Sequence, residues 1–504
     1  MLPGIVVRCF QAGVRFQSER QQLRRDVRYD FRLEKKEKER KKMGRQGNKK
    51  KVVEKDITCV HRVVIWNFLS VLQRRDRPDR FSSTVIAMRN IWLAATVPVS
   101  RPHTFATEVS TVPMAPTKAA GAVRRNVFVI HIRNDPNGAL PCDPKECHLP
   151  NCWCSKDGTT IPGNLTVSTV PQMISITFDD AVNAENFELF SKIFSNDRKN
   201  PNGCPVRGTF YVSHQYTNYR DVQYLWNIGH EIAVHSVTHR GPEEWWSRNA
   251  TIEDWFDEMV GLANIINKYA AVRLEDIKGL RAPFLRIGWN RQFLMMSEFG
   301  FVYDSSILAP FSDVPVWPYT LDYKPPYSCV DLEQFCPTRA YPGLWELPLN
   351  QLLAGQYTCT RMDSCPSDLS GEEIYKILML NFKRHYLSNR APLGLHLHAS
   401  WFQNPSYFYA FTKFMDDVLR LSDVYFVTSY QVIEWMRKPT SLNGIETFKP
   451  WQCNLRKFHP FELACDLPSS CKLPSKVLKS YRYLHTCFEC PKEYPWLRNE
   501  FGME

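Results

Sequence analysis

The sequence predicts an α/β protein built on a mostly parallel sheet or barrel. Apolar strand-like runs alternate with amphipathic helix-like runs through the body of the chain, which is typical of βα units. The expected strands are Ile174–Phe178, Gly208–Val212, Glu231–His235, Leu393–His398 and Val424–Thr428. The expected helices are Ala184–Phe194, Thr251–Tyr269, Arg291–Glu298, Gly371–Tyr386 and Tyr407–Leu421.

The distribution of cysteines indicates an oxidising compartment. Only Cys9 and Cys59 precede residue 140, and the other fourteen of the 16 cysteines lie between Cys142 and Cys490. Cytosolic proteins rarely carry such a number, so we expect a disulfide framework.

A zinc-ribbon protein is the alternative interpretation of these cysteines. It would use the close pairs Cys152-x-Cys154 and Cys487-x-x-Cys490. Neither pair has a partner pair at zinc-finger spacing, which disfavours that interpretation. Two glycosylation sequons, at Asn164 and Asn249, agree with secretion.

The positive charge of the chain is confined to its first quarter. Residues 1–130 carry 28 basic and 11 acidic residues, whereas residues 131–504 carry 36 and 41, although the whole chain has a net charge of +12. The body therefore lacks the basic balance of a nucleic-acid-binding domain, and we expect no nucleic-acid partner.

Residues 1–138 are expected to form a basic, largely disordered region with a signal or anchor segment and a linker. Arg32–Lys51 is a solvated charge block. Val63–Leu72 is apolar but too short to span a bilayer, and Met88–Ser100 resembles a signal peptide. Residues 101–138 are rich in Pro, Thr and Ala, as linkers are. The alternative is a disordered arm on a protein that is not secreted, against which the cysteines argue.

Two adjacent carboxylates, Asp179 and Asp180, follow the strand of "ISITFDDAV". Like charges at a strand end repel each other unless a positive group lies beside them. Farther along, "GHEIAVHSVTHRG" places His235 and His239 four residues apart, a spacing that can present two imidazoles to one metal. The zincin pattern needs Glu after the first histidine, and here Ser236 stands there.

Three further motifs complete the candidate chemistry. They are "RAPF" (Arg281 to Phe284), "VYDSS" with Asp304, and "LGLHLHASW" with His396 and His398. The two histidines of the last motif are two residues apart on a strand, so both point to the same face.

These five motifs, in this order, resemble the polysaccharide deacetylase family, also called the NodB-homology domain or carbohydrate esterase family 4, and above all arthropod chitin deacetylases. The resemblance covers roughly residues 140–500 and includes "NPNGCPVRGTFYVSHQYTNY", "HEIAVHSVTH", "SCKL" and "YPWL". It implies a distorted (β/α) barrel whose site lies at the carboxyl ends of the strands. A cysteine-rich segment would open this domain and a cysteine-rich extension would close it.

The resemblance also implies roles for the motif residues. Asp180, His235 and His239 would hold a divalent metal, most simply Zn²⁺, with positions left open for water and substrate. Asp179 would be the general base, and Arg281 would pair with it. His398 would be the general acid that protonates the departing amine, kept charged by Asp304.

Substrate binding is expected from three aromatic positions. The backbone amide of Phe284 would stabilise the oxyanion, and the rings of Trp289 and Trp401 would stack on the sugar. His396, by contrast, is most simply a core or rim histidine.

The expected organisation is a basic region over 1–138, a polysaccharide deacetylase domain over 139–440 and a cysteine-rich extension over 441–504. The expected activity is metal-dependent removal of N-acetyl groups from N-acetylglucosamine units of chitin or its oligomers. A secreted, chitin-binding matrix organiser with little activity is the alternative. We expect a secreted, monomeric glycoprotein of a chitinous matrix, without a stable membrane span in the catalytic part.

Overall fold

The computed structural model of the 504-residue chain describes residues 7–8, 62–63, 138–329, 334–453 and 464–503. The chain divides into two units, residues 1–122 and 123–504. In the first unit, strand β1 (Val7–Arg8) pairs antiparallel with β2 (Arg62–Val63). The expected signal and linker segments lie outside the described residues, so the domain boundaries at 138 and 440 stay predictions.

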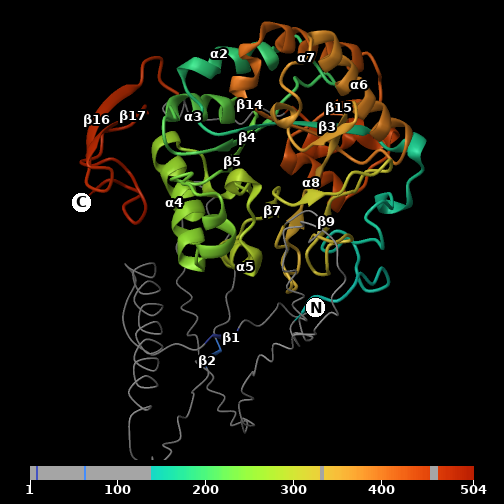
Figure 1. Cartoon of the computed structure of the whole chain (residues 1–504), viewed down its shortest axis with the longest axis horizontal. Coiled ribbons are helices and arrows are strands. Elements are labelled where there is room, and N and C mark those ends of the chain that lie inside the picture. Colours follow the sequence, from blue (N-terminus) through green and yellow to red (C-terminus); the bar gives the residue numbers. More distant parts are fainter. Residues whose placement is uncertain (1–6, 9–61, 64–137, 330–333, 454–463, 504) are drawn as a thin grey trace, which may run out of the picture. The chain divides into compact units, whose positions relative to one another are not determined.

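A nine-stranded sheet organises the second unit (Figure 1). Its order is β14 (Leu393–His398), β3 (Gln172–Asp179), β4 (Thr209–Val212), β5 (Glu231–Val234), β6 (Gly279–Leu280), β7 (Tyr303–Asp304), β10 (Trp345–Glu346) and β9 (Tyr319–Thr320). The ninth strand, β15 (Val424–Phe426), pairs with the start of β3. Every pair is parallel except β10 with β9.

The sheet is curled, but within the described residues its two end strands are not hydrogen-bonded to each other, so it is not a closed barrel. Its order ends at β14 on one side and at β9 on the other. Beyond the end of β7 and β10, strands β8 (Leu308–Ala309) and β11 (Leu349–Asn350) pair in parallel, and β11 contacts β14. The predicted α/β class is confirmed, and the expected distorted barrel takes the form of this open, curled sheet.

The helices follow the strands along the chain as the alternation predicted. They are α2 (Ala184–Ile193), α3 (Tyr219–Asn227), α4 (Ile252–Ala270), α5 (Trp289–Phe299), α6 (Gly371–Leu387), α7 (Pro405–Val418) and α8 (Ser429–Arg437). Several begin at a side chain that caps the first turn: Thr251 accepts from the amide of Asp254, and Ser370 from that of Glu373.

Strand β3 is the centre of the core and ends at the two adjacent carboxylates. All eight of its residues are buried. The ring of Phe178 lies 4.7 Å from that of Phe190 and 5.7 Å from that of Phe210. A strand packed on both faces has little freedom to move, so Asp179 projects from a rigid support.

All fourteen cysteines from Cys142 onward form disulfides, which confirms the predicted framework. The pairs are Cys142–Cys154, Cys147–Cys152, Cys204–Cys453, Cys329–Cys336, Cys359–Cys365, Cys465–Cys487 and Cys471–Cys490. Each of the four cysteines in the two close pairs, Cys152-x-Cys154 and Cys487-x-x-Cys490, is bonded to a cysteine outside its pair. The zinc-ribbon alternative therefore fails.

Two antiparallel hairpins complete the described structure. One joins β12 (Leu352–Ala354) to β13 (Tyr357–Cys359), and the other joins β16 (Ser469–Ser475) to β17 (Ser480–Thr486). The second hairpin lies beside α3, at the left of Figure 1. The segment after it is held on α4, where the Arg498 guanidinium lies 2.6 Å from the carboxylate of Asp257.

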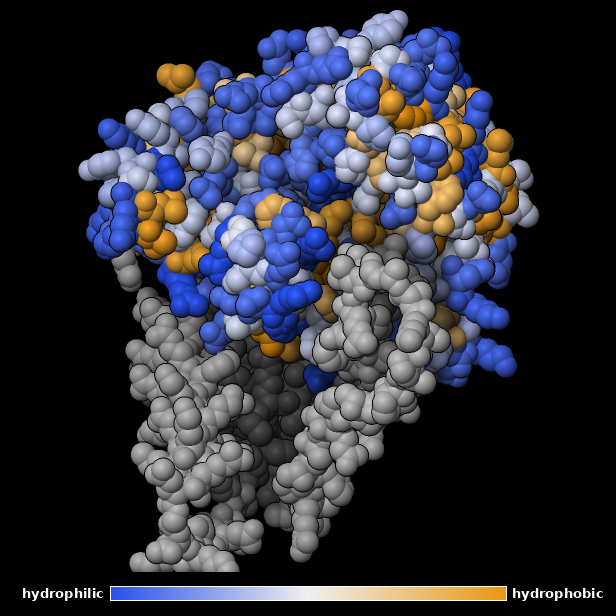
Figure 2. Space-filling model, in the orientation of Figure 1, coloured by the Kyte–Doolittle hydropathy of each residue, from blue (hydrophilic) through white to orange (hydrophobic). Residues whose placement is uncertain are grey.

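The surface of the second unit is largely hydrophilic in the view of Figure 2. Among the described residues, no helix combines the length and the apolar character needed to cross a membrane.

Replacing Phe178 by Ala tests the role of β3 as the central support. Removing a fully packed aromatic ring leaves a cavity, so we expect the free energy of unfolding to fall by about 3–5 kcal/mol. Denaturant unfolding of the full chain measures this change. Tyr409→Ala is the matched control, because that ring is 69% exposed. Equal stability of the two variants would contradict the packing described here.

Candidate active site and metal centre

The residues with candidate chemistry gather where the parallel strands end. Asp179 ends β3, His235 follows β5, Arg281 follows β6 and His398 ends β14. Because parallel strands have their carboxyl ends at one edge of the sheet, motifs far apart in sequence meet there.

Asp180, His235 and His239 form a cluster that could hold a metal ion. One ligand atom from each residue lies within 4.8 Å of the others. The Nδ1 atom of His235 is 2.9 Å from the carbonyl oxygen of Arg281, to which it donates. This hydrogen bond leaves Nε2 as the ligand atom and fixes the orientation of the ring.

The backbone around this cluster is held in uncommon conformations. Asp180, Ser236 and His239 have φ values of 82°, 87° and 44°, in the left-handed region that non-glycine residues rarely adopt. The Ser236 hydroxyl accepts a 3.0 Å hydrogen bond from the His239 amide, so this serine acts within the histidine loop, as its position suggested. Such conformations cost about 1–3 kcal/mol each and are typical of functional sites.

The two adjacent carboxylates have different surroundings. The side chain of Asp180 is 45% exposed, with Oδ1 3.7 Å from Nε2 of His239. Asp179 is buried, and its Oδ1 accepts a 2.7 Å hydrogen bond from Nη1 of Arg281. Its Oδ2 is buried without a hydrogen-bond partner in the described part of the chain.

Burial alone would raise the pKa of Asp179, but the positive charge of the hydrogen-bonded Arg281 guanidinium outweighs burial and holds the pKa well below its ordinary value. Asp179 is therefore ionised at rest, with one oxygen hydrogen-bonded to Arg281 and the other without a partner among the described residues.

Arg281 is fully buried, and its guanidinium is fully engaged. Nε donates to the Ser305 carbonyl at 2.8 Å and Nη2 to the Ser305 hydroxyl at 3.0 Å. Nη1 also donates to the Thr177 hydroxyl at 2.8 Å, and the guanidinium carbon lies 4.0 Å from the centre of the Tyr211 ring. These contacts fix the group that orients Asp179.

His396 belongs to this network and is buried rather than at the rim. Its Nδ1 lies 3.2 Å from Nη2 of Arg281 and 2.9 Å from the Thr177 hydroxyl. Because a guanidinium only donates, Nδ1 is an acceptor and the ring is neutral. Burial lowers the pKa of His396 well below its usual range, in agreement. A Cβ on Gly394 would lie 2.5 Å from Nε2 of His396, so this glycine makes room for the ring.

The register of β14 against β3 separates the roles of the two histidines. His396 lies opposite Thr177, and His398 lies opposite Asp179. Both side chains therefore lie on the same face, as their spacing predicted, but only His398 is at the strand end. Its Nε2 is 3.6 Å from Oδ2 of Asp180.

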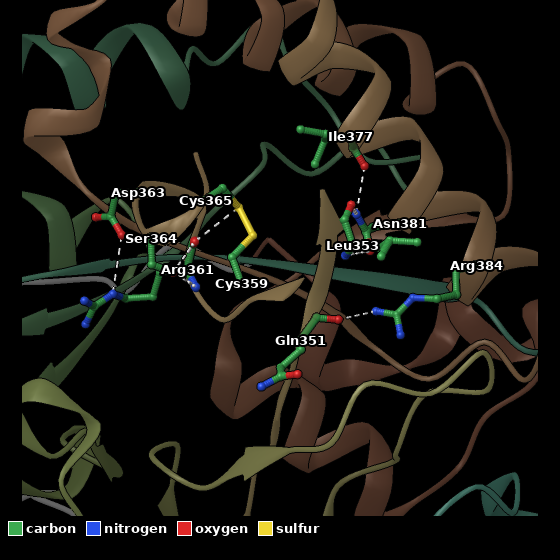
Figure 3. The surroundings of a disulfide bond; sticks show 10 residues. All are labelled: Gln351, Leu353, Cys359, Arg361, Asp363, Ser364, Cys365, Ile377, Asn381 and Arg384. Atoms are coloured by element: carbon green, nitrogen blue, oxygen red, sulfur yellow. Dashed lines mark hydrogen bonds and ion pairs between the residues drawn. A yellow bond between two sulfur atoms is a disulfide. The ribbon is translucent and has the colours of Figure 1, made fainter. Parts of the chain in front are cut away.

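The charged partner of His398 is Asp363, which the sequence did not reveal. Asp363 lies in the short loop closed by the Cys359–Cys365 disulfide (Figure 3). Its Oδ2 pairs with Nδ1 of His398 and accepts a 2.9 Å hydrogen bond from the His398 amide. Arg361 Nε lies 3.4 Å from the other carboxylate oxygen.

The pairing of His398 with Asp363 shifts the pKa of both groups. Burial lowers the pKa of His398, but the hydrogen bond and the charge of Asp363 outweigh burial and raise it above its ordinary value. Burial likewise opposes ionisation of Asp363, yet His398 lowers the pKa of this carboxyl.

The expectation that Asp304 keeps His398 charged is wrong. Asp304 ends β7, and four strands separate β7 from β14 in the sheet. It is fully buried, where it accepts from Gln292 at 2.8 Å and from the Ser306 hydroxyl at 2.8 Å. Burial raises the pKa of Asp304 to about 6, and Glu346 is hydrogen-bonded to it.

Asp304 thus supports the site indirectly. The Ser306 hydroxyl, which donates to Asp304, accepts a 2.8 Å hydrogen bond from the Ala282 amide. That amide lies between Arg281 and Phe284, so Asp304 helps to fix the loop that carries both residues.

The aromatic positions differ in how they are presented. The Phe284 ring is 4.5 Å from the His239 ring, and its backbone is left-handed with φ 56°. Trp289 is 43% exposed at the start of α5. Trp401 is half-buried and packs on Tyr407, with ring centres 4.9 Å apart. Their roles in substrate binding stay predictions.

The donor set suits a divalent transition metal. Two imidazoles and one carboxylate are ligands that zinc accepts, and three protein ligands leave a position for water or substrate. The orientation of His235 by Arg281 and the free, buried oxygen of Asp179 beside the cluster both fit such an ion.

Comparison with known proteins gives two strong sequence matches. The chain is 47% identical over 387 residues to "Chitin deacetylase 1" of Bombyx mori, covering 74% of this chain and 70% of that protein. It is 36% identical over 377 residues to "Chitin deacetylase 8" of Bombyx mori, covering 72% and 94%. No protein-family model matches the chain.

Solved structures match more weakly. A family 4 carbohydrate esterase from Streptomyces lividans is 13% identical, with 50% of this chain and 91% of that chain covered and a TM-score of 0.29. A peptidoglycan deacetylase from Bacillus subtilis is 13% identical, with 57% and 100% covered and a TM-score of 0.30. The description of the fold rests on the strand order given above rather than on these matches.

Metal content tests the proposed centre. His235→Ala removes one of three ligands, so we expect the purified full chain to lose most of its bound zinc, with affinity lowered at least tenfold. Elemental analysis after dialysis against a zinc buffer measures this loss. His485→Ala, on the C-terminal hairpin, should retain the metal. Full zinc occupancy in His235→Ala would contradict the assignment.

Proposed function

The chain belongs to the chitin deacetylase family, and from this membership we propose that it hydrolyses N-acetyl groups of N-acetylglucosamine units in chitin or chitin oligomers. The products would be acetate and a glucosamine unit. One observation carries the proposal beyond family membership: two consecutive carboxylates occupy different environments, one beside two imidazoles and one buried against an arginine.

Asp180, His235 and His239 would hold the metal, zinc or another divalent ion. Bound there, the ion would polarise the acetamide carbonyl and lower the pKa of a water molecule toward about 7. Asp179 is matched to that task. Its Oδ1 is held in place by Arg281, and its Oδ2 is left to accept a proton from that water.

Asp179 supplies the accepting atom. Its Oδ1 is held by Arg281, so the free Oδ2 is the oxygen that takes a proton from water while the water oxygen adds to the acetyl carbonyl carbon. Arg281 keeps that oxygen in place throughout, since its own position is fixed by Ser305 and Thr177. The Phe284 amide is the proposed donor to the developing oxyanion.

His398 supplies the proton for the leaving group. The amide C–N bond breaks as the amine nitrogen takes the proton from Nε2, which leaves acetate and a free amine. Asp363 holds Nδ1 of the ring and stabilises the protonated form before the transfer. Asp363 acts on the reaction only through this histidine.

Secretion is part of the proposal. Seven disulfides stabilise the second unit, which is the pattern of an oxidising compartment. The sequon residues Asn164 and Asn249 are both exposed, as N-glycosylation requires. A chitinous extracellular matrix is the location that this chemistry fits.

Asp179→Asn tests the reaction. The amide keeps the shape of the side chain but cannot accept a proton as a base, so we expect kcat/KM for acetate release from chitin oligomers to fall by about 10²–10⁴-fold. A chelator should stop the wild-type reaction, and zinc should restore it. Asp197→Asn, at an exposed aspartate, is the matched control.

The outcome that contradicts this function is specific. A folded wild-type chain that contains zinc and binds chitin, but releases no acetate from any oligomer, would favour the matrix-binding alternative. Thermal unfolding of Asp179→Asn shows whether a loss of activity reflects chemistry or loss of the fold.

Asp363→Asn tests the partner of His398. We expect kcat to fall by about 10–100-fold with little change in KM, because proton delivery weakens while the substrate contacts stay. Steady-state kinetics on a chitin oligomer measure both constants. Asp368→Asn, an exposed aspartate just outside the disulfide loop, should behave as wild type. A rise in KM alone would assign Asp363 to substrate binding instead.

A further inference from the structure

The C-terminal hairpin presents two tyrosine rings to solvent on one face. Tyr481 and Tyr483 alternate along β17 with inward-facing residues, and they are 62% and 55% exposed. Alternate residues of a strand lie on one face about 7 Å apart. Across the register, Pro474 lies opposite Tyr481 and Lys472 opposite Tyr483.

This face is rigid. Cys471–Cys490 ties β16 to the segment after the hairpin, and Cys465–Cys487 ties the approach to β16 to the end of β17. The inward residues Leu473 and Leu484 are buried. Rings on a stapled strand lose little freedom when they bind a flat partner, which lowers the entropic cost of binding.

A third exposed tyrosine lies on the loop after β4. Tyr216 is 72% exposed, and its backbone is left-handed with φ 68°. A strained non-glycine backbone that displays an aromatic ring to water has no evident benefit for the stability of the fold. Strain of this kind is typical of a binding role.

The loop of Tyr216 connects the metal centre to the hairpin. On one side, the Gln215 side chain donates a 3.1 Å hydrogen bond to the carbonyl of Thr238, in the histidine loop. On the other side, Asn218 forms a parallel bridge with His485, two residues beyond Tyr483. The loop of Tyr216 is therefore joined to the histidine loop by a side-chain hydrogen bond and to the hairpin by a backbone bridge.

The residues on the outward face of the β16–β17 hairpin indicate which kind of polysaccharide this face could bind. Besides Tyr481 and Tyr483, the outward positions of the two described strands carry Ser470, Lys472, Pro474 and His485, none of which is acidic. Lys472 Nζ lies 5.2 Å from the centre of the Tyr481 ring. Such a face, with one positive charge and two exposed rings, suits an uncharged sugar chain better than a polycationic one, such as a deacetylated polymer.

We propose that Tyr216, Tyr483 and Tyr481 form an auxiliary binding track for acetylated chitin polymer, beyond the chain length that the active site itself holds. Each tyrosine ring would stack on the C–H face of a pyranose unit. The track rests on the proposed function for its choice of substrate. It would add affinity for long chains and none for short oligomers.

The experiment compares three forms of the full chain: wild type, the double variant Tyr481→Ala/Tyr483→Ala, and the control Tyr409→Ala on α7. Depletion from solution by insoluble chitin gives an apparent Kd for each form, and acetate release from a soluble chitin tetramer gives kcat/KM. We expect the double variant to bind insoluble chitin about 5–25-fold more weakly, with tetramer turnover within twofold of wild type. Tyr409→Ala should match wild type in both.

Further variants separate stacking from other effects. Tyr481→Phe/Tyr483→Phe should retain chitin binding, because the ring faces remain, and Tyr216→Ala should weaken it. Binding of wild type and double variant to fully deacetylated polymer should agree within twofold. Unchanged chitin binding in the double variant would overturn the proposal, as would an equal loss on the deacetylated polymer.

A parallel loss of tetramer turnover and thermal stability in the double variant would also overturn it, because the hairpin would then be only structural. A different result would reject the proposed function. Absence of acetate release by wild type, together with tyrosine-dependent binding to chitin, would reject the enzyme and keep the track.

Discussion

The buried ion pair between Arg281 and Asp179 is the constraint on which the rest of the site depends. Two charges taken out of water are tolerated only when their remaining hydrogen-bonding groups are satisfied, and removing one partner of such a pair costs about 3–5 kcal/mol. The surrounding structure meets this requirement for the guanidinium with Ser305, Thr177, His396 and the face of Tyr211. The Asp179 carboxylate does not meet the same requirement, because its Oδ2 is buried without a hydrogen-bond partner among the described residues.

That asymmetry explains why two adjacent carboxylates are needed. A single aspartate could not both be held by an arginine in the interior and reach the two histidines at the strand end. Successive side chains at the end of β3 leave in different directions, so Asp179 turns into the core and Asp180 toward the two histidines. The left-handed backbone of Asp180 makes this divergence possible at a cost in strain.

The sequence predicted those parts of the structure that follow from local pattern. The alternation of strands and helices, the cysteine framework and the joint location of His235 and His239 all have short-range signals. The pairing of Arg281 with Asp179 agrees with the expectation taken from the family resemblance.

Other contacts depended on tertiary geometry that no local pattern encodes. The family resemblance pairs Asp304 with His398, but four strands of the sheet separate β7 from β14. Asp363 was missed because it lies 35 residues from His398, in a loop without strand or helix periodicity. His396 was judged a core or rim histidine, since only the register of β14 against β3 places it under Arg281. Thr177 had a weak signal: it shares a strand face with Asp179.

The loop between Cys359 and Cys365 has a consequence for the surroundings of His398. The Asp-His-His cluster, Asp179 and Arg281 are all supported by the sheet and its strand ends, whereas Asp363, the partner of His398, is carried on a loop that one covalent cross-link closes. In a folded chain with these two cysteines reduced, the sheet would still place Asp179 and Asp180 beside the two histidines, whereas the segment that carries Asp363 would lack its cross-link. The charge environment of His398 is in this way tied to an oxidised Cys359–Cys365 pair as well as to the sheet.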